Sequence, residues 1–276
     1  MHTPLRTLNP VQSIRTLWSS RSLLRELVIR DVALRYKGSV LGYFWAILTP
    51  LITLAIFTYV FSVVLRARWP GMPEQDSHLG FALAAFCGMV GFQAFSEPVG
   101  RSATLITSNP NFVKKIVFPL EALPLMTACS AAVLAVLNLI TLLAVTWLVT
   151  GRIPVTVVAW PLVILPALLL GLGVAWFVAA LGVYLRDLGQ LIGPLLQMLY
   201  LLTPVLYPLS AVPEAVRWLV GANPLTVVAE GSRAVLVAGQ WPDWSMLATA
   251  LLVSVCVAQL GYAWFVTTKW GFADVV

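Results

Sequence analysis

Few side chains in this sequence are of the types that catalyse reactions or bind metal ions. The chain has only two histidines, His2 near its start and His78 between two apolar stretches, and its 11 acidic residues are scattered. A catalytic or metal site needs several such groups in one place. The three cysteines, Cys87, Cys129 and Cys256, lie far apart in apolar stretches and have no metal-binding or redox spacing. We therefore expect no catalytic residues, no metal site and no enzymatic activity in this chain.

The sequence also lacks the phosphate-binding loop of ATPases. In that loop a lysine follows a glycine, and none of the four lysines does so. An ATP-driven function would therefore place ATP and magnesium on a separate subunit and leave this chain without a cofactor. Ion-driven transporters carry ionisable residues deep in the membrane. The one serious candidate is Glu97, near the end of an apolar stretch and next to Pro98, where a carboxylate more often orients a helix end than relays protons.

The elements that must position these residues are membrane-spanning helices. The chain is 60% hydrophobic and 10% charged, whereas soluble domains are about 25% charged. A membrane-spanning helix needs about 20 mostly apolar residues. Stretches of that kind predict six spans, near Leu41–Leu65, Leu79–Val99, Leu123–Val149, Val155–Tyr184, Leu191–Tyr207 and Met246–Thr267. We expect an all-α integral membrane protein, with an N-terminal cytoplasmic and interface segment over residues 1–40 and a six-span domain over residues 41–276.

The basic residues predict the orientation of these spans. With six spans both ends of the chain share one side, and 12 of the 17 basic residues fall on that side. Basic residues concentrate on the cytoplasmic side, so both termini are expected to be cytoplasmic. This rule, with attraction to anionic lipids, accounts for the net charge of +6 without nucleic acid. The first 40 residues lack the apolar core and cleavage site of a secretory signal, and we expect them to be retained.

Two regions outside the spans predict short helices. Residues 21–30 place apolar side chains largely on one helical face and charged ones on the other, which predicts an amphipathic helix in the membrane interface. The region between the fifth and sixth spans is too apolar for an ordinary loop and predicts two re-entrant pieces, Pro213–Val220 and Pro224–Ala238. Asn223 before Pro224 is typical of a helix N-cap. We expect the second region to form an external gate that contains two acid–base pairs at i,i+3 spacing, Glu214 with Arg217 and Glu230 with Arg233.

Three stretches together resemble the membrane subunits of ABC-2 type exporters, in the branch that exports O-antigen, capsule and teichoic-acid polymers. The first reads RYKGSVLGYFW at Arg35–Trp45 and is followed by Thr49–Leu51. The second reads NPNFVKKIVFPLE at Asn109–Glu121. The third runs through YLRDL at Tyr184–Leu188, TPVLYP at Thr203–Pro208, NPL at Asn223–Leu225 and Arg233. The family often has serine where Thr203 stands, a change that keeps the hydroxyl.

The resemblance implies a homodimer in the bacterial inner membrane, docked on a cytoplasmic ABC ATPase that binds ATP and magnesium. The substrate would be an undecaprenyl-linked glycan. The segment near residues 21–35 would be the interface helix, and Asn109–Phe118 the coupling helix that enters a groove on the ATPase. The residues expected to couple the chain to the ATPase are Arg25, Asp31, Asn111, Phe112, Val113, Lys114, Lys115, Arg186 and Asp187. A basic loop that serves topology alone remains an alternative for the lysine pair.

Aromatic residues suggest where a glycan would pass. Sugar rings present C–H faces that can stack on aromatic side chains, and aromatics crowd the first span. The expected channel residues are Tyr36, Tyr43, Trp45, Tyr59 and Tyr207. Aromatic belts at span ends are the alternative explanation.

Other functions stay open at this point. A related permease could carry teichoic acid, small lipids or drugs. A transporter of another class would need deep ionisable residues or an internal repeat, and a membrane transferase would need clustered carboxylates or histidines. We see neither pattern. The close pair Gly171 and Gly173 is more typical of closely approaching helices than of a nucleotide site.

Overall fold

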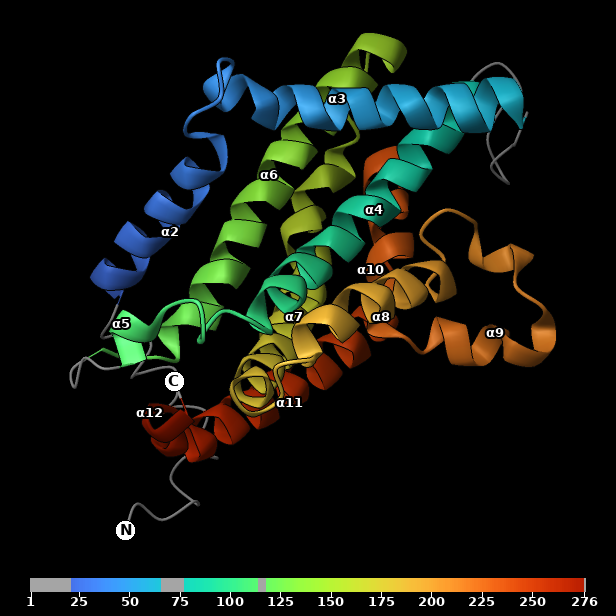
Figure 1. Cartoon of the computed structure of the whole chain (residues 1–276). Coiled ribbons are helices and arrows are strands. Elements are labelled where there is room, and N and C mark those ends of the chain that lie inside the picture. Colours follow the sequence, from blue (N-terminus) through green and yellow to red (C-terminus); the bar gives the residue numbers. More distant parts are fainter. Residues whose placement is uncertain (1–20, 66–76, 114–117, 276) are drawn as a thin grey trace.

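The computed structural model describes residues 21–65, 77–113 and 118–275, and all regular secondary structure in these ranges is helical (Figure 1). Five helical stretches are long and apolar enough to cross a membrane: Gly42–Phe61, Gly80–Ser102, Ala122–Leu148, Val155–Tyr184 and Trp244–Gly271. The prediction of an all-helical membrane protein is confirmed at this level. Residues 1–20 of the expected N-terminal segment lie outside the described ranges.

The helices follow one another along the chain with short connections. They are α2 (Arg21–Tyr36), η2 (Gly42–Phe44), α3 (Trp45–Phe57), η3 (Thr58–Val64), α4 (Ser77–Ser102), α5 (Pro110–Val113), α6 (Ala122–Thr150), η5 (Val155–Ala159), α7 (Trp160–Tyr184), α8 (Leu188–Leu202), η6 (Leu209–Ala211), α9 (Glu214–Gly221), α10 (Pro224–Arg233), η7 (Ala234–Ala238), α11 (Trp244–Thr268), η8 (Lys269–Gly271) and α12 (Phe272–Val275). The predicted helix at residues 21–30 is therefore present as α2, which continues to Tyr36.

The fifth predicted span is shorter in the structure than in the prediction. Helix α8 has 15 residues, about 22 Å at 1.5 Å per residue, against a hydrocarbon core of about 30 Å. It ends at Leu202, and the residue that follows, Thr203, takes an extended conformation (φ −84°, ψ 138°). The cause is Pro204, because a proline disfavours the helical conformation of the residue before it. Tyr207, predicted on this span, lies beyond the end of the helix.

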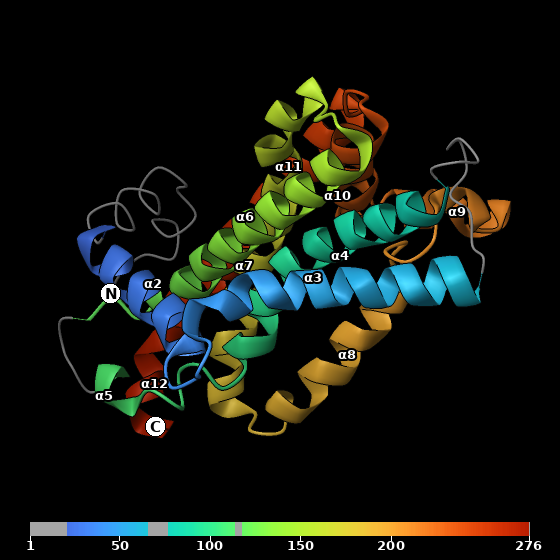
Figure 2. The same cartoon turned by 90° about the horizontal axis from the view of Figure 1, so that it is seen from above.

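Helix α7 is the central element and packs against α4 and α11 (Figures 1 and 2). Glycines allow these close approaches. A Cβ at Gly171 would lie 2.9 Å from the carbonyl oxygen of Phe95 in α4, and a Cβ at Gly173 would lie 2.6 Å from that of Val257 in α11. A Cβ at Gly261 of α11 would in turn lie 2.0 Å from the carbonyl oxygen of Gly173. The prediction that Gly171 and Gly173 let helices approach is confirmed.

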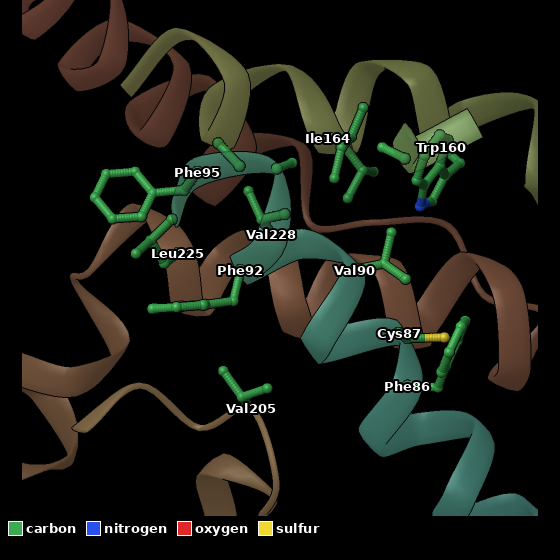
Figure 3. Packing of buried hydrophobic residues seen from close by; sticks show 14 of the residues in the cluster. Phe86, Cys87, Val90, Phe92, Phe95, Trp160, Ile164, Val205, Leu225 and Val228 are labelled. Atoms are coloured by element: carbon green, nitrogen blue, oxygen red, sulfur yellow. The ribbon is translucent and has the colours of Figure 1, made fainter. Parts of the chain in front are cut away.

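The main core lies where α4 meets α7 and α10. Figure 3 shows α4 side chains packed beside those of α7 and α10, among them Phe86, Cys87, Val90, Phe95, Trp160, Ile164, Leu225 and Val228. Such helix contacts in lipid depend on dispersion and close fit, since lipid tails are as apolar as the side chains. Helix α10 is therefore an integral part of the bundle, whereas α9 has no buried residue and lies at its periphery.

Helix α3 crosses α6 and α4 obliquely and leaves most of its side chains exposed (Figures 1 and 2). The connection from α2 turns sharply through Gly38 and Gly42, whose φ angles are 90° and 51°. Residues with a Cβ rarely adopt such positive φ values. These two glycines of the RYKGSVLG stretch thus set the direction in which α3 leaves α2.

Candidate functional site

Four charged side chains form a closed ring of ion pairs where α2 meets the last turns of α4. Arg101 donates two hydrogen bonds to Asp31, with Nη1–Oδ2 at 2.9 Å and Nη2–Oδ1 at 2.5 Å. Arg35 pairs with Glu97 and lies 3.9 Å from Asp31. Glu97 also lies 3.8 Å from Arg101. The ring fastens α2 to α4 with two positive and two negative charges.

The ring is partly buried, and burial affects its members unequally. The Asp31 side chain is 11% exposed and that of Arg101 is 35% exposed. Burial raises the pKa of Asp31, but the hydrogen bonds from Arg101, the hydroxyl of Ser130 and the positive charges of Arg101 and Arg35 together more than offset this, so the pKa lies below the ordinary value of 3.8. Asp31 is therefore an anion at neutral pH. Asp31 also forms an i,i+4 ion pair with Arg35 along α2, although the bidentate contact with Arg101 is the closer one.

Arg101 and Glu97 also line a groove of about 440 Å³ between α4 and α8. Figure 2 shows α8 running beside α4. The residues that line the groove repeat at helical spacing on both helices: Met89, Phe92, Gln93, Ser96, Glu97, Gly100 and Arg101 from α4, and Gly193, Leu196, Gln197 and Tyr200 from α8. Polar groups within a membrane-spanning helix are costly to keep there, so they generally mark a functional path.

Neighbouring side chains hold the groove in shape. Gln93 accepts a hydrogen bond from the amide of Asn138 in α6, with Nδ2–Oε1 at 3.1 Å. The rings of Phe92 and Tyr200 meet edge to face with centroids 5.0 Å apart. The glycines leave space: a Cβ at Gly193 would meet no atom within 4 Å. The groove is thus a preformed, mixed polar and aromatic surface.

The five aromatic residues predicted for the channel do not line this groove. Tyr36 and Tyr43 lie on the two sides of the α2–α3 turn with ring centroids 5.7 Å apart. Tyr43, Trp45 and Tyr59 are exposed on the outer surface of the α3 stretch. The hydroxyl of Tyr207 donates to the carbonyl oxygens of Leu201 and Leu202 at the end of α8, and it therefore caps that helix. Their role in a channel stays a prediction.

Most of the predicted coupling residues lie at one end of the bundle. Phe112 of α5 stacks on Phe118 (centroids 4.3 Å apart) and packs against a second core cluster that includes Val183 of α7 and Phe272 of α12. Arg186 and Asp187, in the turn after α7, and Asn111 are exposed. Asp31 is not grouped with them, because its carboxylate is engaged by Arg101. Arg25 is exposed on α2. Lys114, Lys115 and the side chain of Val113 lie outside the described parts.

The two predicted gate pairs differ in strength. Arg233 is buried and donates to Glu230 (2.9 Å), to the carbonyl oxygen of Ala84 in α4 (2.9 Å) and to that of Val205 (2.5 Å). It thus ties α10 to α4 and to the segment after α8. Glu214 and Arg217 are 4.0 Å apart on exposed α9, which contributes little. Asn223 accepts a hydrogen bond from the Leu225 amide (3.0 Å), which confirms the predicted N-cap.

Sequence reasoning missed the groove and the ring, although a signal was present. Polar residues recur at Gln93, Ser96, Glu97 and Arg101 within an apolar span, and this i, i+3, i+4, i+8 spacing places them on one helical face. Glu97 was considered alone as a proton carrier. In the structure its carboxylate is held by two arginines instead.

The described parts form a bundle with five helices long and apolar enough to cross a membrane, and a groove with polar and aromatic lining lies beside α4, which is the architecture of a multi-pass membrane protein. Residues 22–237 match the ABC-2 type transporter family, and the chain belongs to that family. It is a transporter membrane subunit and not an enzyme.

Several curated proteins are similar to the chain over most of its length. The O-antigen export system permease protein RfbA of Myxococcus xanthus is 30% identical over 269 residues, 96% of this chain and 100% of that protein. A Klebsiella pneumoniae protein of the same name is 25% identical over 256 residues, 92% of this chain and 95% of that protein. The polysialic acid transport protein KpsM of Escherichia coli is 25% identical over 249 residues, 88% of this chain and 92% of that protein.

Proposed function

We propose that this chain is the permease subunit of an ABC exporter that moves a lipid-linked polysaccharide of the O-antigen kind across the inner membrane. ATP would be hydrolysed, with magnesium, on a separate cytoplasmic subunit, because no lysine of the chain follows a glycine as the phosphate-binding loop requires. The single observation that carries the proposal is the alignment with the Myxococcus xanthus O-antigen permease over that protein's whole length.

The same proposal includes a topology. The 12 basic residues on the side of the termini support a cytoplasmic location for both ends. Helix α8, completed by the segment from Thr203, would be the fifth of six spans, and α9 and α10 would be re-entrant on the external side. We also propose a homodimer, since α3 and α8 expose apolar faces that a second subunit can cover.

Coupling to the ATPase would take place at the end that carries α5 and the turn after α7. The exposed Asn111, Arg186 and Asp187 present polar groups there, while Phe112 and the second core cluster form a packed base. A packed base can transmit a small movement of the ATPase to the spans. Asn111→Trp should weaken co-purification of the ATPase without affecting the fold, because Asn111 is exposed. The control is Trp218→Ala on α9, where the side chain is also exposed.

The proposal is tested by deleting the gene from its host and measuring surface polysaccharide. We expect lipid-linked glycan to accumulate inside the cell and to disappear from the surface, with recovery when the gene is restored. Recovery should fail when the lysine of the phosphate-binding loop in the partner ATPase is replaced. Normal surface polysaccharide in the deletion strain would contradict the proposed function, and an altered drug sensitivity in its place would indicate a drug permease.

A further inference from the structure

The groove between α4 and α8 changes in chemical character along its length. Arg101 and Glu97 lie at the end of α4 that the proposed topology places on the cytoplasmic side. About one to two helical turns further are the neutral polar groups of Gln93, Ser96 and Gln197. The aromatic rings of Phe92 and Tyr200 lie beside Gln93, and the apolar side chain of Met89 lies about one turn further along α4. A ligand that matches this order of groups along the groove has an anionic group, then hydroxyl groups, with an apolar tail in the adjacent lipid.

Arg101 is the positively charged residue that the groove offers. Asp31 holds its guanidinium by two hydrogen bonds, and Asp31 itself does not line the groove. The ring of ion pairs therefore fixes the guanidinium while leaving the Arg101 side chain 35% exposed. A guanidinium binds phosphate oxygens through parallel N–H donors. A phosphate that enters the groove can take up donors now directed at the carboxylates.

The middle of the groove fits sugar hydroxyls. An amide and a hydroxyl both donate and accept hydrogen bonds, so Gln93, Ser96 and Gln197 can match hydroxyls of either orientation. Asn138 occupies the carbonyl oxygen of Gln93, which directs the Gln93 amide. The Tyr200 ring provides an apolar face with a polar tip for a sugar ring.

We propose that this groove binds the headgroup of an anionic glycolipid, with Arg101 contacting the phosphate and Gln93, Ser96, Gln197 and Tyr200 contacting the first sugars. The inference rests on the proposed function and adds to it the site at which the substrate is recognised. The proposal also assigns a role to the ring of ion pairs. Phosphate competes with Asp31 for Arg101, so ligand binding loosens the contact between α2 and α4.

Direct binding tests this site on the purified full-length chain in nanodiscs of neutral lipid. The probes are polyprenyl diphosphate bearing a short oligosaccharide, polyprenol and inorganic pyrophosphate. We expect the glycolipid to raise the melting temperature, because a ligand that binds the folded state stabilises it, and polyprenol to leave it unchanged. Pyrophosphate should bind more weakly than the glycolipid. Equal binding of pyrophosphate and glycolipid would overturn the role given to the amides and to Tyr200.

A charge exchange separates ligand binding from a structural role of Arg101. The double variant Asp31→Arg/Arg101→Asp keeps an ion pair between α2 and α4 but removes the positive charge from the groove wall. The exchange places the new charges beside the like charges of Arg35 and Glu97, so we expect the double variant to fold with lower stability than the wild type. We expect it to bind glycolipid at least about tenfold more weakly, as the loss of a charge-assisted hydrogen bond predicts. Wild-type affinity in this variant would overturn the proposal.

A second variant fills the groove without touching the ion pairs. Gly193→Phe directs a ring into space where no atom lies within 4 Å of the new Cβ, and it should block binding. Met198→Phe is the matched control, because Met198 is exposed on the same helix and does not line the groove. Unchanged binding in Gly193→Phe would overturn the proposal even if the charge exchange had failed to fold.

The outcomes also distinguish the inference from the function on which it rests. Normal polysaccharide export by both groove variants would refute the binding site and leave the permease assignment intact. Binding of glycolipid that depends on Arg101, in a chain whose deletion leaves surface polysaccharide unchanged, would refute the proposed function and leave the site standing.

Discussion

The crossing of α7 and α11 allows a quantitative prediction for Gly261→Ala. The new Cβ would lie 2.0 Å from the carbonyl oxygen of Gly173 and 2.8 Å from its carbon, whereas a normal carbon–oxygen contact is about 3.3–3.6 Å. The obstacle is backbone on a packed helix, so no rotamer change can relieve it. The two helices must separate by about 1 Å, which forfeits about a quarter to a half of the dispersion energy of each contact along the crossing.

The expected loss follows from two opposing terms. Overpacking of this kind costs about 1–3 kcal/mol, and replacing glycine by alanine within a helix recovers up to about 1 kcal/mol. With the full gain from alanine, we expect Gly261→Ala to lower the free energy of unfolding by up to about 2 kcal/mol. The matched control is Gly100→Ala on α4, whose Cβ would meet only the flexible Leu196 side chain at 3.4 Å. That variant should be neutral or up to about 1 kcal/mol more stable.

The assay is unfolding in mixed dodecylmaltoside and SDS micelles, followed by tryptophan fluorescence, with both variants measured beside the wild type. Only the sign of the difference between the two variants needs to be resolved. Equal stability of Gly261→Ala and Gly100→Ala would refute the reasoning, because the close helix crossing would then contribute nothing that an added methyl group disturbs.

Three further predictions concern charged residues. Arg233→Lys should destabilise the chain by about 2–3 kcal/mol, since one ammonium group cannot replace the guanidinium that reaches three acceptors. Wild-type stability in the same micelle assay would show that these three hydrogen bonds are dispensable. Lys269→Met should lower the free energy of unfolding more than Glu121→Gln does, because it leaves the nearly buried Glu121 carboxylate, 3.1 Å from Lys269 Nζ, without its partner. The same unfolding assay on the two single variants measures this difference, and a larger loss in Glu121→Gln would contradict it. The stability difference between wild type and Asp31→Asn should be constant around neutral pH and shrink once the pH falls below about 3.8. The reason is that a lowered pKa in the folded state stabilises the protein only where the carboxyl group of the unfolded chain is ionised. A difference that instead grew towards acid pH would contradict the assigned pKa direction.

The sequence by itself determined the solvent, the secondary structure class and several local features. An apolar chain with 10% charged residues can bury its surface only in lipid, and in lipid the backbone must bond internally, which favours helices. The Asn223 cap and the glycine contacts of α7 were predictable because neighbouring residues or residue size decide them. The resemblance to ABC-2 exporters was likewise carried by short stretches read in order.

Only the tertiary structure decided which distant residues meet. Asp31 and Arg101 are 70 positions apart, and the i,i+4 rule that links Asp31 to Arg35 gives no information about a second helix. The α4–α8 groove depends on the angle between two helices and on the early end of α8 at Leu202. The predicted aromatic residues lie elsewhere, at the end of α2, on the exposed surface of the α3 stretch or at the end of α8. Residue type shows which side chains can stack on a sugar but not which face of a span borders a groove.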